Sequence, residues 1–500
     1  MERDEVTKLM ANYEDSHDIG EYTLENINVW PLIRLWLAFR LYENIGIPGS
    51  QKRQPGGGCP LCEASVRIAR KIGRLIHDRF SGKSSGRKKK TDAVLLTRSD
   101  RDTIVGDTYY NTIMDPISMT LEKNGISCVT WETGPRKSPR WREPLWISDS
   151  LDWNAGKGRI LSLGDSFKNP PWLEEFLEFA KPLQENITRE TVQSLLHNLF
   201  SYAAVFEKWL KDCRAKILII DCWYNVLFLS ASLAARRLGI PVIDVQHGLQ
   251  GEGHFAYSHW KKRPKVDSID LMPDRFWVWG RRDEKDLVSF NPGVITESRV
   301  FIGGNLWLEV WRRPGEYEFS GISKEVEEAR SLTRGFEKTI LVTLQKNLDF
   351  SHPLYPAIEK SPENQLWLIR LHRHTVDRFE EYEKQYQAVH HPHINLADAT
   401  FRPLYALFQV ADVHITGYST CAMEALAFGL PTILLLETGK KVYQSFIDKG
   451  AFFYSDTPEA LLDAIGRSGD VPHELCKECS GDVFSPGSRV VDVVKEMLSR

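Results

Sequence analysis

Two segments of the chain place small and polar residues directly after apolar, strand-like runs. Residues 242–257 read VIDVQHGLQGEGHFAY and residues 411–435 read ADVHITGYSTCAMEALAFGLPTILL, with a helix expected over 418–428. A strand, a small-residue turn and a helix present backbone N–H groups at the carboxyl edge of a parallel sheet, where α/β proteins bind phosphates. The two segments therefore predict two Rossmann-like halves whose binding edges face one cleft.

The first segment offers a candidate for proton transfer. His247 follows the apolar run and precedes a glycine that permits a tight turn, so we expect its imidazole to face the cleft. Histidine suits a general base near neutral pH, where it can take the proton of an acceptor hydroxyl; the alternative is a structural histidine. Glu252 and His254 in the same loop are further catalytic candidates. Asp221, at the end of another apolar run, is a fourth, or it caps the helix that follows.

The second segment offers candidates for holding a nucleotide. The backbone N–H groups of residues 418–421 and the Ser419 and Thr420 hydroxyls can cradle a phosphate, and Arg370 can add positive charge. Glu424, one helical turn further on, can accept ribose hydroxyls. The alternatives are N-capping for Ser419 and Thr420 and an exposed helix position for Glu424. The nucleotide-binding candidates are Gln345, Arg370, His372, Gly417, Tyr418, Ser419, Thr420 and Glu424.

The elements that must position these residues alternate between short apolar, β-branched runs and helical stretches, a pattern typical of parallel doubly wound sheets. In the first half we expect strands at 93–97, 126–131, 217–221, 242–246, 276–279 and 299–302. In the second half we expect strands at 339–344, 365–371, 413–416 and 432–436. The predicted fold class is α/β: two Rossmann-like doubly wound domains facing an interdomain cleft, with an N-terminal helical extension.

The predicted domain limits follow from these patterns. We expect a helical extension with a basic segment at 1–90, an acceptor domain at 91–303 and a polar linker at 304–337. A nucleotide-donor domain at 338–470 follows, and a C-terminal helix in 471–500 should cross back to the first domain. Within the extension, apolar residues at helical spacing, interrupted by Arg34 and Arg40, predict an amphipathic helix over 18–46.

A basic segment follows that helix. From Arg67 to Lys90 there are ten Lys or Arg residues against one acid, Asp78, beside an apolar stripe. Such a segment would dock on an anionic membrane surface, where each cation contributes about 1 kcal/mol. The alternative is a solvated helix followed by a linker.

Composition narrows the choice of partners. A net charge of −3 argues against a nucleic-acid binder. No apolar run is long enough for a membrane span and the first residues are not those of a signal peptide, so we expect a cytoplasmic protein, peripheral on the inner face of the cytoplasmic membrane if the basic segment docks there. Two CxxC pairs, Cys59/Cys62 and Cys476/Cys479, could share a zinc ion, or they are four free thiols. We expect no cofactor and no catalytic metal.

Several of these residues form a pattern that resembles the bacterial surface and capsular polysaccharide glycosyltransferases of the GT-B fold. In the first half the pattern is Gln246-His247-Gly248, then His254 and Tyr257, Pro273-Asp274, Trp279-Gly280 and Gly303-Gly304-Asn305. In the second half Arg370-Leu371-His372 resembles the Arg-x-His-Pro element of sialyl-, Kdo- and polyol-phosphate transferases, although Arg373 stands where proline is common. Gly417-Tyr418-Ser419-Thr420 with Glu424 resembles their nucleotide element. The Asp/Glu-Asp/Glu-Gly element of some sialyltransferases has no match.

The resemblance implies a glycosyltransferase with His247 as a catalytic residue. It would transfer a sugar from a nucleotide-sugar donor, with a CMP-sugar such as CMP-Kdo favoured, to a cell-surface glycan or glycolipid acceptor. Two alternatives stay open. One is a CDP-polyol phosphotransferase that builds a polyol-phosphate polymer, and the other is a UDP-sugar 2-epimerase.

Overall fold

The computed structural model describes most of the 500-residue chain. The described residues are 3–43, 90–148, 150–151, 167, 169–184, 186–248, 250–262, 267–317, 319–345, 353–373, 375–469, 471 and 489–499. Apart from Lys90, the basic segment lies outside these ranges, as do all four cysteines of the two CxxC pairs. Among the described residues no helix is long and apolar enough to cross a membrane.

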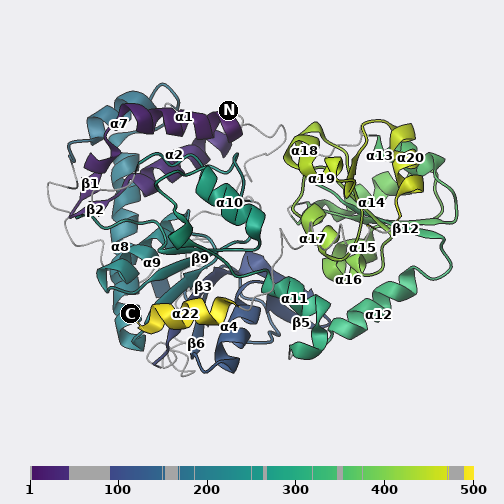
Figure 1. The fold of residues 1–500 in the computed structure, drawn as a ribbon, viewed down its shortest axis with the longest axis horizontal. Helices are drawn as coiled ribbons and strands as arrows, with labels where there is room; N and C mark the ends of the chain where they lie inside the picture. Colours follow the sequence, from purple (N-terminus) through teal and green to yellow (C-terminus); the bar gives the residue numbers. More distant parts are fainter. Residues whose placement is uncertain are drawn as a thin grey trace, which may run out of the picture.

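The first lobe is built on a seven-stranded parallel sheet (Figure 1). Its strands are β3 (Ala93–Arg98), β6 (Cys128–Thr133), β7 (Leu145–Trp146), β8 (Ile217–Ile220), β9 (Val242–Val245), β10 (Arg275–Val278) and β11 (Val300–Ile302). They lie in the order β11-β10-β9-β8-β3-β6-β7. Counted along the chain this is the Rossmann order, and it reverses direction between β3 and β8.

The second lobe repeats the same winding in a six-stranded parallel sheet. Its strands are β12 (Lys338–Thr343), β13 (Gln365–Arg370), β14 (Ile394–Asn395), β15 (Val413–Thr416), β16 (Thr432–Leu434) and β17 (Phe452–Tyr454). Their order is β14-β13-β12-β15-β16-β17, with the reversal between β12 and β15. Two doubly wound sheets in one chain make the GT-B type of fold, so the predicted fold class is confirmed.

Helices cover both faces of each sheet. They are α1 (Arg3–Ser16), α2 (Trp30–Glu43), α4 (Met114–Lys123), α7 (Leu173–Ala180), α8 (Arg189–Cys213), α9 (Val226–Arg237), α10 (Arg281–Ser289), α11 (Leu306–Arg312), α12 (Ile322–Leu332), α13 (Leu354–Lys360), α14 (Phe379–Gln387), α15 (Ala397–Phe401), α16 (Leu404–Phe408), α17 (Cys421–Ala427), α18 (Glu437–Val442), α19 (Gln444–Asp448), α20 (Pro458–Arg467) and α22 (Arg489–Ser499). Short 3₁₀ turns occur at η1 (Ile19–Glu21), η3 (Ser99–Arg101), η4 (Glu297–Arg299), η5 (Pro314–Glu316) and η6 (Val376–Arg378). Two hairpins complete the described elements, β1 (Thr23–Leu24) with β2 (Ile27–Asn28) and β4 (Asp102–Val105) with β5 (Thr108–Asn111).

Strand β3 shows why its sequence is apolar throughout. Val94 and Leu96 belong to the core under α8 and α9, whereas Ala93 and Leu95 belong to the core on the opposite face with α4 and α22. Because successive strand residues point to opposite faces, a strand covered on both sides needs apolar residues at every position. The yellow helix α22, the last described element, thus lies against the first lobe beside α4 (Figure 1).

The strands expected from the sequence are all present, most of them with shifted ends. The start of β6 moves most, from the expected residue 126 to Cys128. Gly125 has a φ of +79° and the Ile126 N–H donates to the Leu121 carbonyl at 3.1 Å, so Ile126 belongs to the C-cap of α4. The short strands β7, β14 and β17 were not predicted, because two or three residues carry no periodicity.

The predicted amphipathic helix over 18–46 is wrong in two respects. Residues 18–29 form η1 and the β1–β2 hairpin, in which Glu25 and Asn26 adopt left-handed φ values of 48° and 64°. Helix α2 starts only at Trp30, and it is buried on nearly every side. Arg34 is 0% exposed on α2 and its Nε lies 2.9 Å from Oε1 of the equally buried Glu14 on α1. Burial lowers the pKa of Arg34 to about 10, and the facing Glu14 carboxylate opposes this.

Candidate active site

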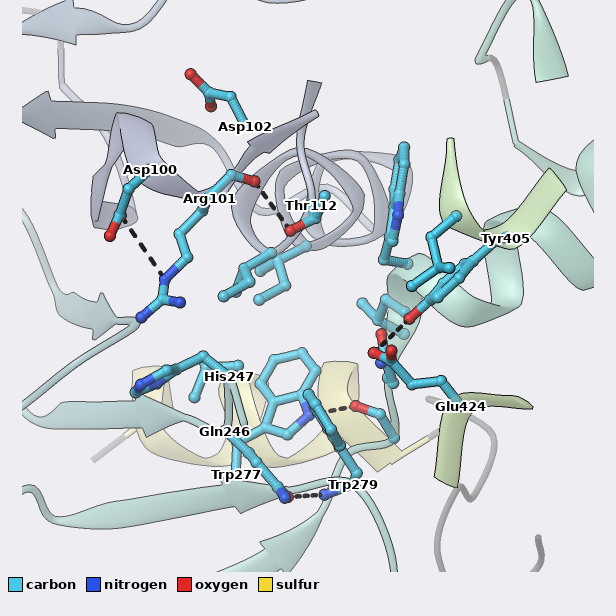
Figure 2. Close-up of a pocket in the computed structure, with 18 of the residues that line it drawn as sticks. Asp100, Arg101, Asp102, Thr112, Gln246, His247, Trp277, Trp279, Tyr405 and Glu424 are labelled. Atoms are coloured by element: carbon cyan, nitrogen blue, oxygen red, sulfur yellow. Dashed lines mark hydrogen bonds and ion pairs between the residues drawn. The ribbon is translucent and has the colours of Figure 1, made fainter. Parts of the chain in front are cut away.

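A cavity of about 350 Å³ lies between the two lobes, at the carboxyl ends of strands from both sheets. From the first lobe, Arg101, His247 and Trp279 line it. From the second lobe, Arg373, Tyr405 and Glu424 do so. Figure 2 shows His247 and Arg101 on one side of this space and the Tyr405–Glu424 pair on the other. Such a crevice outside the carboxyl ends of parallel strands is where doubly wound proteins bind ligands.

His247 is presented by the end of β9. The preceding Gln246 side chain is held by two hydrogen bonds. Its Oε1 accepts from the Trp279 backbone N–H at 2.7 Å (Figure 2). Its Nε2 donates to the Gly248 carbonyl at 3.1 Å. These bonds anchor the end of β9 to β10, and the side chain after Gln246, that of His247, lines the cavity. Its Nε2 lies 2.7 Å from the Tyr224 hydroxyl, and its Nδ1 is buried. A hydrogen bond with the Val245 backbone also acts on the imidazole and partly opposes the fall in its pKa.

The surroundings keep this imidazole neutral. Burial lowers the pKa of His247 well below its usual value, and the positive charge of Arg101 and the neighbouring His254 lower it further. Burial also raises the pKa of the Tyr224 phenol well above 10. When Nε2–H donates to the Tyr224 oxygen, Nδ1 carries a lone pair and can accept a proton; the reverse tautomer makes Nδ1 a donor. The pair can therefore move a proton in either direction.

Asp221 lies behind the cavity wall instead of capping a helix. Its side chain is 0% exposed, accepts from the Thr97 hydroxyl at 2.8 Å and lies 3.5 Å from Arg101 Nε. Asn225 caps α9 by accepting from the Phe228 N–H at 3.1 Å, so the helix-cap alternative for Asp221 is wrong. The Asp221 carboxylate instead orients Arg101, which does line the cavity.

The two loop candidates do not line the cavity. His254 is buried, its Nδ1 accepts from the Ala256 N–H at 3.3 Å, and its ring centre lies 5.2 Å from that of Tyr224. The Glu252 side chain is 68% exposed and lies 3.7 Å from His259. The structure thus separates His247, at the cavity, from Glu252, at the surface, with His254 packed behind Tyr224.

Arginines dominate the second-lobe side of the strand ends. Arg370, the last residue of β13, donates through Nη1 to the carbonyls of Ala399 and Arg402 at 2.7 and 2.6 Å, and burial lowers its pKa to about 10. Arg373 reaches across to the Asp100 carbonyl at 3.4 Å, and both burial and the nearby Arg101 lower its pKa. Arg101 and Arg373 thus bring positive charge from opposite lobes to one cavity, as binding of an anionic group requires.

In the sequence, His372 lies between Arg370 and Arg373. It is half-buried, and its carbonyl accepts from the Thr375 N–H and from the Thr375 hydroxyl, both at 2.8 Å. It does not line the cavity. The next histidine in the sequence, residue 374, lies outside the described residues.

The turn from Gly417 to Thr420 satisfies much of its own hydrogen bonding. The Tyr418 N–H donates to Gln345 Oε1 at 2.6 Å, and the Cys421 N–H donates to Ser419 Oγ at 3.2 Å. Helix α17 accordingly starts at Cys421, later than the expected residue 418, and the Thr420 side chain makes no cap. Neither Ser419 nor Thr420 lines the cavity.

Glu424 is the second-lobe carboxyl that does line the cavity. The Tyr405 hydroxyl donates to its Oε1 at 2.7 Å, and burial raises the pKa of Glu424 to about 7 (Figure 2). The alternative of an ordinary exposed helix glutamate is therefore wrong. At neutral pH this group is divided between its acid and carboxylate forms, so it can both donate and accept hydrogen bonds.

The N-terminal extension fastens the loop that follows His247. Arg34 Nη1 donates to the Phe255 carbonyl at 2.7 Å and its Nη2 to the Ser258 carbonyl at 3.0 Å. From the same α2, the Phe39 ring packs 5.6 Å from the ring of Tyr224, the partner of His247. Sequence reasoning missed this support, and it also missed Arg101, Tyr224 and Tyr405. Only Arg101 and Tyr224 carried a usable signal, their position just after a strand.

Comparisons with known proteins do not assign the chain to a family. No family model and no curated protein matches it. Among solved structures, the UDP-GlcNAc 2-epimerase from Neisseria meningitidis bound to UDP-GlcNAc is 15% identical with a TM-score of 0.47, covering 82% of this chain and 99% of that one. The UDP-GlcNAc 2-epimerase from Methanocaldococcus jannaschii is 16% identical with a TM-score of 0.48, covering 81% and 99%. A variant of the wall teichoic acid polymerase TagF is 10% identical with a TM-score of 0.45, covering 87% and 98%. At such values the likeness establishes neither family nor activity.

Proposed function

We propose that the chain is a group-transfer enzyme that takes a sugar from a nucleotide sugar, first of all a CMP-sugar such as CMP-Kdo, and passes it to a cell-surface glycan or glycolipid. The observation that carries the proposal is the interlobe cavity itself. It brings together a His247 whose pKa is lowered by burial, arginines from both lobes and the Glu424–Tyr405 pair. Proton removal on one side and anion binding on the other are what transfer from a phosphate leaving group requires.

On the acceptor side, His247 would take the proton of the attacking hydroxyl. The Tyr224 hydroxyl, 2.7 Å from Nε2, would hold the imidazole in position. Asp221 would act through Arg101, which it approaches at 3.5 Å. His254 would act through Tyr224, and Glu252 would meet the acceptor from the loop surface.

On the donor side, Arg101, Arg370 and Arg373 would neutralise the leaving phosphate, and Glu424 would accept the ribose hydroxyls. We propose that Gln345, Gly417, Tyr418, Ser419 and Thr420 serve this site mainly by holding the turn before α17, and thereby Glu424, in place. His372 would hold the turn that carries Arg373. In this proposal residues 91–303 bind the acceptor and residues 338–470 bind the donor, with 304–337 linking them.

A donor screen tests the proposal. Purified chain is incubated with CMP-, CDP-, UDP- and GDP-linked donors, with and without glycan acceptors, and nucleotide release and product mass are followed by chromatography and mass spectrometry. We expect release of a nucleotide that depends on an acceptor and is lost in His247→Ala. No turnover of any donor, or turnover that the substitution leaves unchanged, would overturn the proposal.

The same screen separates the two alternatives. A CDP-polyol phosphotransferase would release CMP and add a polyol phosphate to the acceptor. A UDP-sugar 2-epimerase would convert its substrate without any acceptor and without releasing nucleotide at each turnover. For location, we propose a cytoplasmic enzyme held at the inner face of the cytoplasmic membrane by residues 64–90. Co-sedimentation with anionic vesicles at low salt tests this, since the attraction is screened over about 10 Å at 0.1 M salt.

A further inference from the structure

A second cavity of about 200 Å³ lies between the lobes, apart from the one that holds His247. In Figure 1, α10 runs along the edge of the first lobe that faces α17–α19 of the second. Arg281, Arg282, Lys285 and Asp286 of α10 line one side, and Ser445 and Lys449, in and just after α19, line the other.

This second cavity carries an excess of positive charge. Four of its lining side chains are cations and one is an acid. The acid, Asp286, lies 3.8 Å from Arg282 Nε and forms an ion pair with it. Arg282 also donates to the Val442 carbonyl. Arg281 and Lys285 are exposed, and neither makes an ion pair or side-chain hydrogen bond with another described residue. Like charges in one cleft repel, and an anion placed among them converts that repulsion into attraction.

Arg282 forms the fixed part of this cavity. Its Nη2 donates to the Val442 carbonyl of the second lobe at 3.1 Å, and its guanidinium lies 5.2 Å from the centre of the Phe446 ring. The remaining cations stand on both sides of this contact, Arg281 and Lys285 on the first lobe and Lys449 on the second. A ligand that engages them would therefore bind both lobes at once.

We propose that this cavity binds a phosphate-bearing anion that bridges α10 and α19. A volume of about 200 Å³ is below the roughly 300–1,000 Å³ typical of sites for drug-sized ligands, but it suffices for a phosphate or pyrophosphate group. Lysine supplies compact charges and arginine a fork of donors, and both suit phosphate oxygens presented in several directions. The binding holds whichever group the first cavity transfers.

Calorimetric titration of the full chain with pyrophosphate tests the proposal. The test variant combines Arg281→Gln, Lys285→Gln and Lys449→Gln, which all change exposed side chains. A matched control combines Lys181→Gln, Lys384→Gln and Lys495→Gln, which are exposed lysines outside both cavities. We expect the test variant to bind at least about 100-fold more weakly at this site, because it loses three charge-assisted contacts. The control should bind like the unmodified protein.

The arginines of the first cavity also attract pyrophosphate, so the titration is repeated in Arg373→Gln. Pyrophosphate binding at the second cavity, which the test variant loses, must persist in Arg373→Gln. Vesicles of phosphatidylglycerol and of phosphatidylcholine then distinguish the source of the phosphate. If the test variant also loses co-sedimentation with phosphatidylglycerol, and pyrophosphate competes, the ligand is a lipid headgroup; if only pyrophosphate binding falls, it is a soluble phosphate. If test variant and control both titrate like the unmodified protein, the proposal is overturned.

Discussion

The two sheets wind in the same order, yet their carboxyl edges carry different groups. At the first edge Asp221, Asp244 and His247 are titratable, and burial raises the pKa of both carboxyls and lowers that of the imidazole. At the second edge arginines and one carboxyl, Glu424, line the cavity, and the turn before α17 is held by neutral contacts such as Tyr418 N–H to Gln345 Oε1 at 2.6 Å. The winding decides where a site forms, and the side chains decide which chemistry each lobe can supply.

The two edges are also supported differently. The first relies on a separate extension, because α1 and α2 join the first-lobe core and Arg34 holds the loop after His247. The second is held by close backbone contact within its own lobe. A Cβ on Gly439 would lie 2.1 Å from the Gly417 carbonyl oxygen, and the Tyr443 hydroxyl donates to the Ser419 carbonyl at 3.1 Å. Each edge can therefore be disturbed without touching the other.

The largest expected effect is on the rate. His247→Ala should lower kcat by about 10²–10⁴-fold, since it removes a general base, while leaving donor affinity nearly unchanged. Steady-state kinetics and calorimetry with the donor give the two quantities. The surface substitution His390→Ala is the control and should change neither. A variant that turns over normally would place the base elsewhere, and a variant that loses donor affinity would remove the distinction between the edges.

The second largest effect should come from removing Arg34, which links the N-terminal extension to the first edge, and it should appear in the free energy of unfolding. Arg34→Met leaves Glu14 as an unpaired buried carboxylate, so we expect the free energy of unfolding of the first lobe to fall by about 3–5 kcal/mol. Urea denaturation measures it, with the half-buried Arg40→Met on the same helix as control. Adding Glu14→Gln to Arg34→Met should restore part of the loss. If Arg34→Met is no worse than Arg40→Met, the extension does not anchor this edge.

The strands were predictable because both faces of each sheet are covered. A run such as Ile217–Ile220 is apolar at every position, and that signal is local. The turn of the β1–β2 hairpin was not predictable, since nothing local in Glu25-Asn26 requires left-handed φ. Arg34 looked like the polar face of a helix because its partner, Glu14, lies 20 positions away in the sequence (34 − 14).

The site was predictable only as far as strand ends identify it. His247 lies two residues after the end of a strand, Arg370 ends a strand, and Glu424 lies in the helix after one. Tyr405 lies on the five-residue helix α16, and it reaches Glu424 only through the packing of α16 on α17. The role of Ser419 and Thr420 could not be read from their position, because a neighbouring strand supplies the Gln345 side chain to the same turn.

The support of the second edge should give a smaller effect. Gly439→Ala places a methyl group against the Gly417 backbone, so the turn before α17 must move. We expect a loss of about 1–3 kcal/mol in the free energy of unfolding and weaker donor binding. Gly466→Ala is the matched control, because its added methyl meets nothing within 4 Å in helix α20 and should be neutral or slightly stabilising. If Gly439→Ala and Gly466→Ala had the same free energy of unfolding and the same donor affinity, the close contact between Gly439 and Gly417 would be contradicted.

The smallest expected effect is on the pH dependence of the free energy of unfolding, to which His247 and Glu424 contribute slopes of opposite sign. The pKa of His247 is lowered on folding, so its contribution to stability is present above its unfolded value of 6.5 and is lost as pH falls. The pKa of Glu424 is raised from 4.5 to about 7, so its contribution is present at acid pH and is lost as pH rises toward 7. Between pH 5 and 6.5 the imidazole therefore makes stability rise with pH, and the carboxyl makes it fall.

Removing each group should change the pH slope in opposite directions. In urea denaturation at pH 5, 5.5, 6 and 6.5, His247→Ala should make the slope of stability against pH more negative, and Glu424→Gln should make it more positive. Each change is at most about 1.4 kcal/mol per pH unit, the value for one proton. Asp115 and Glu132 of the first lobe, with pKa values raised to about 7 and 8, titrate in the same way in all three proteins and cancel in the differences. Slopes that shift in the same direction would show that His247 and Glu424 do not differ in the sign of their proton linkage.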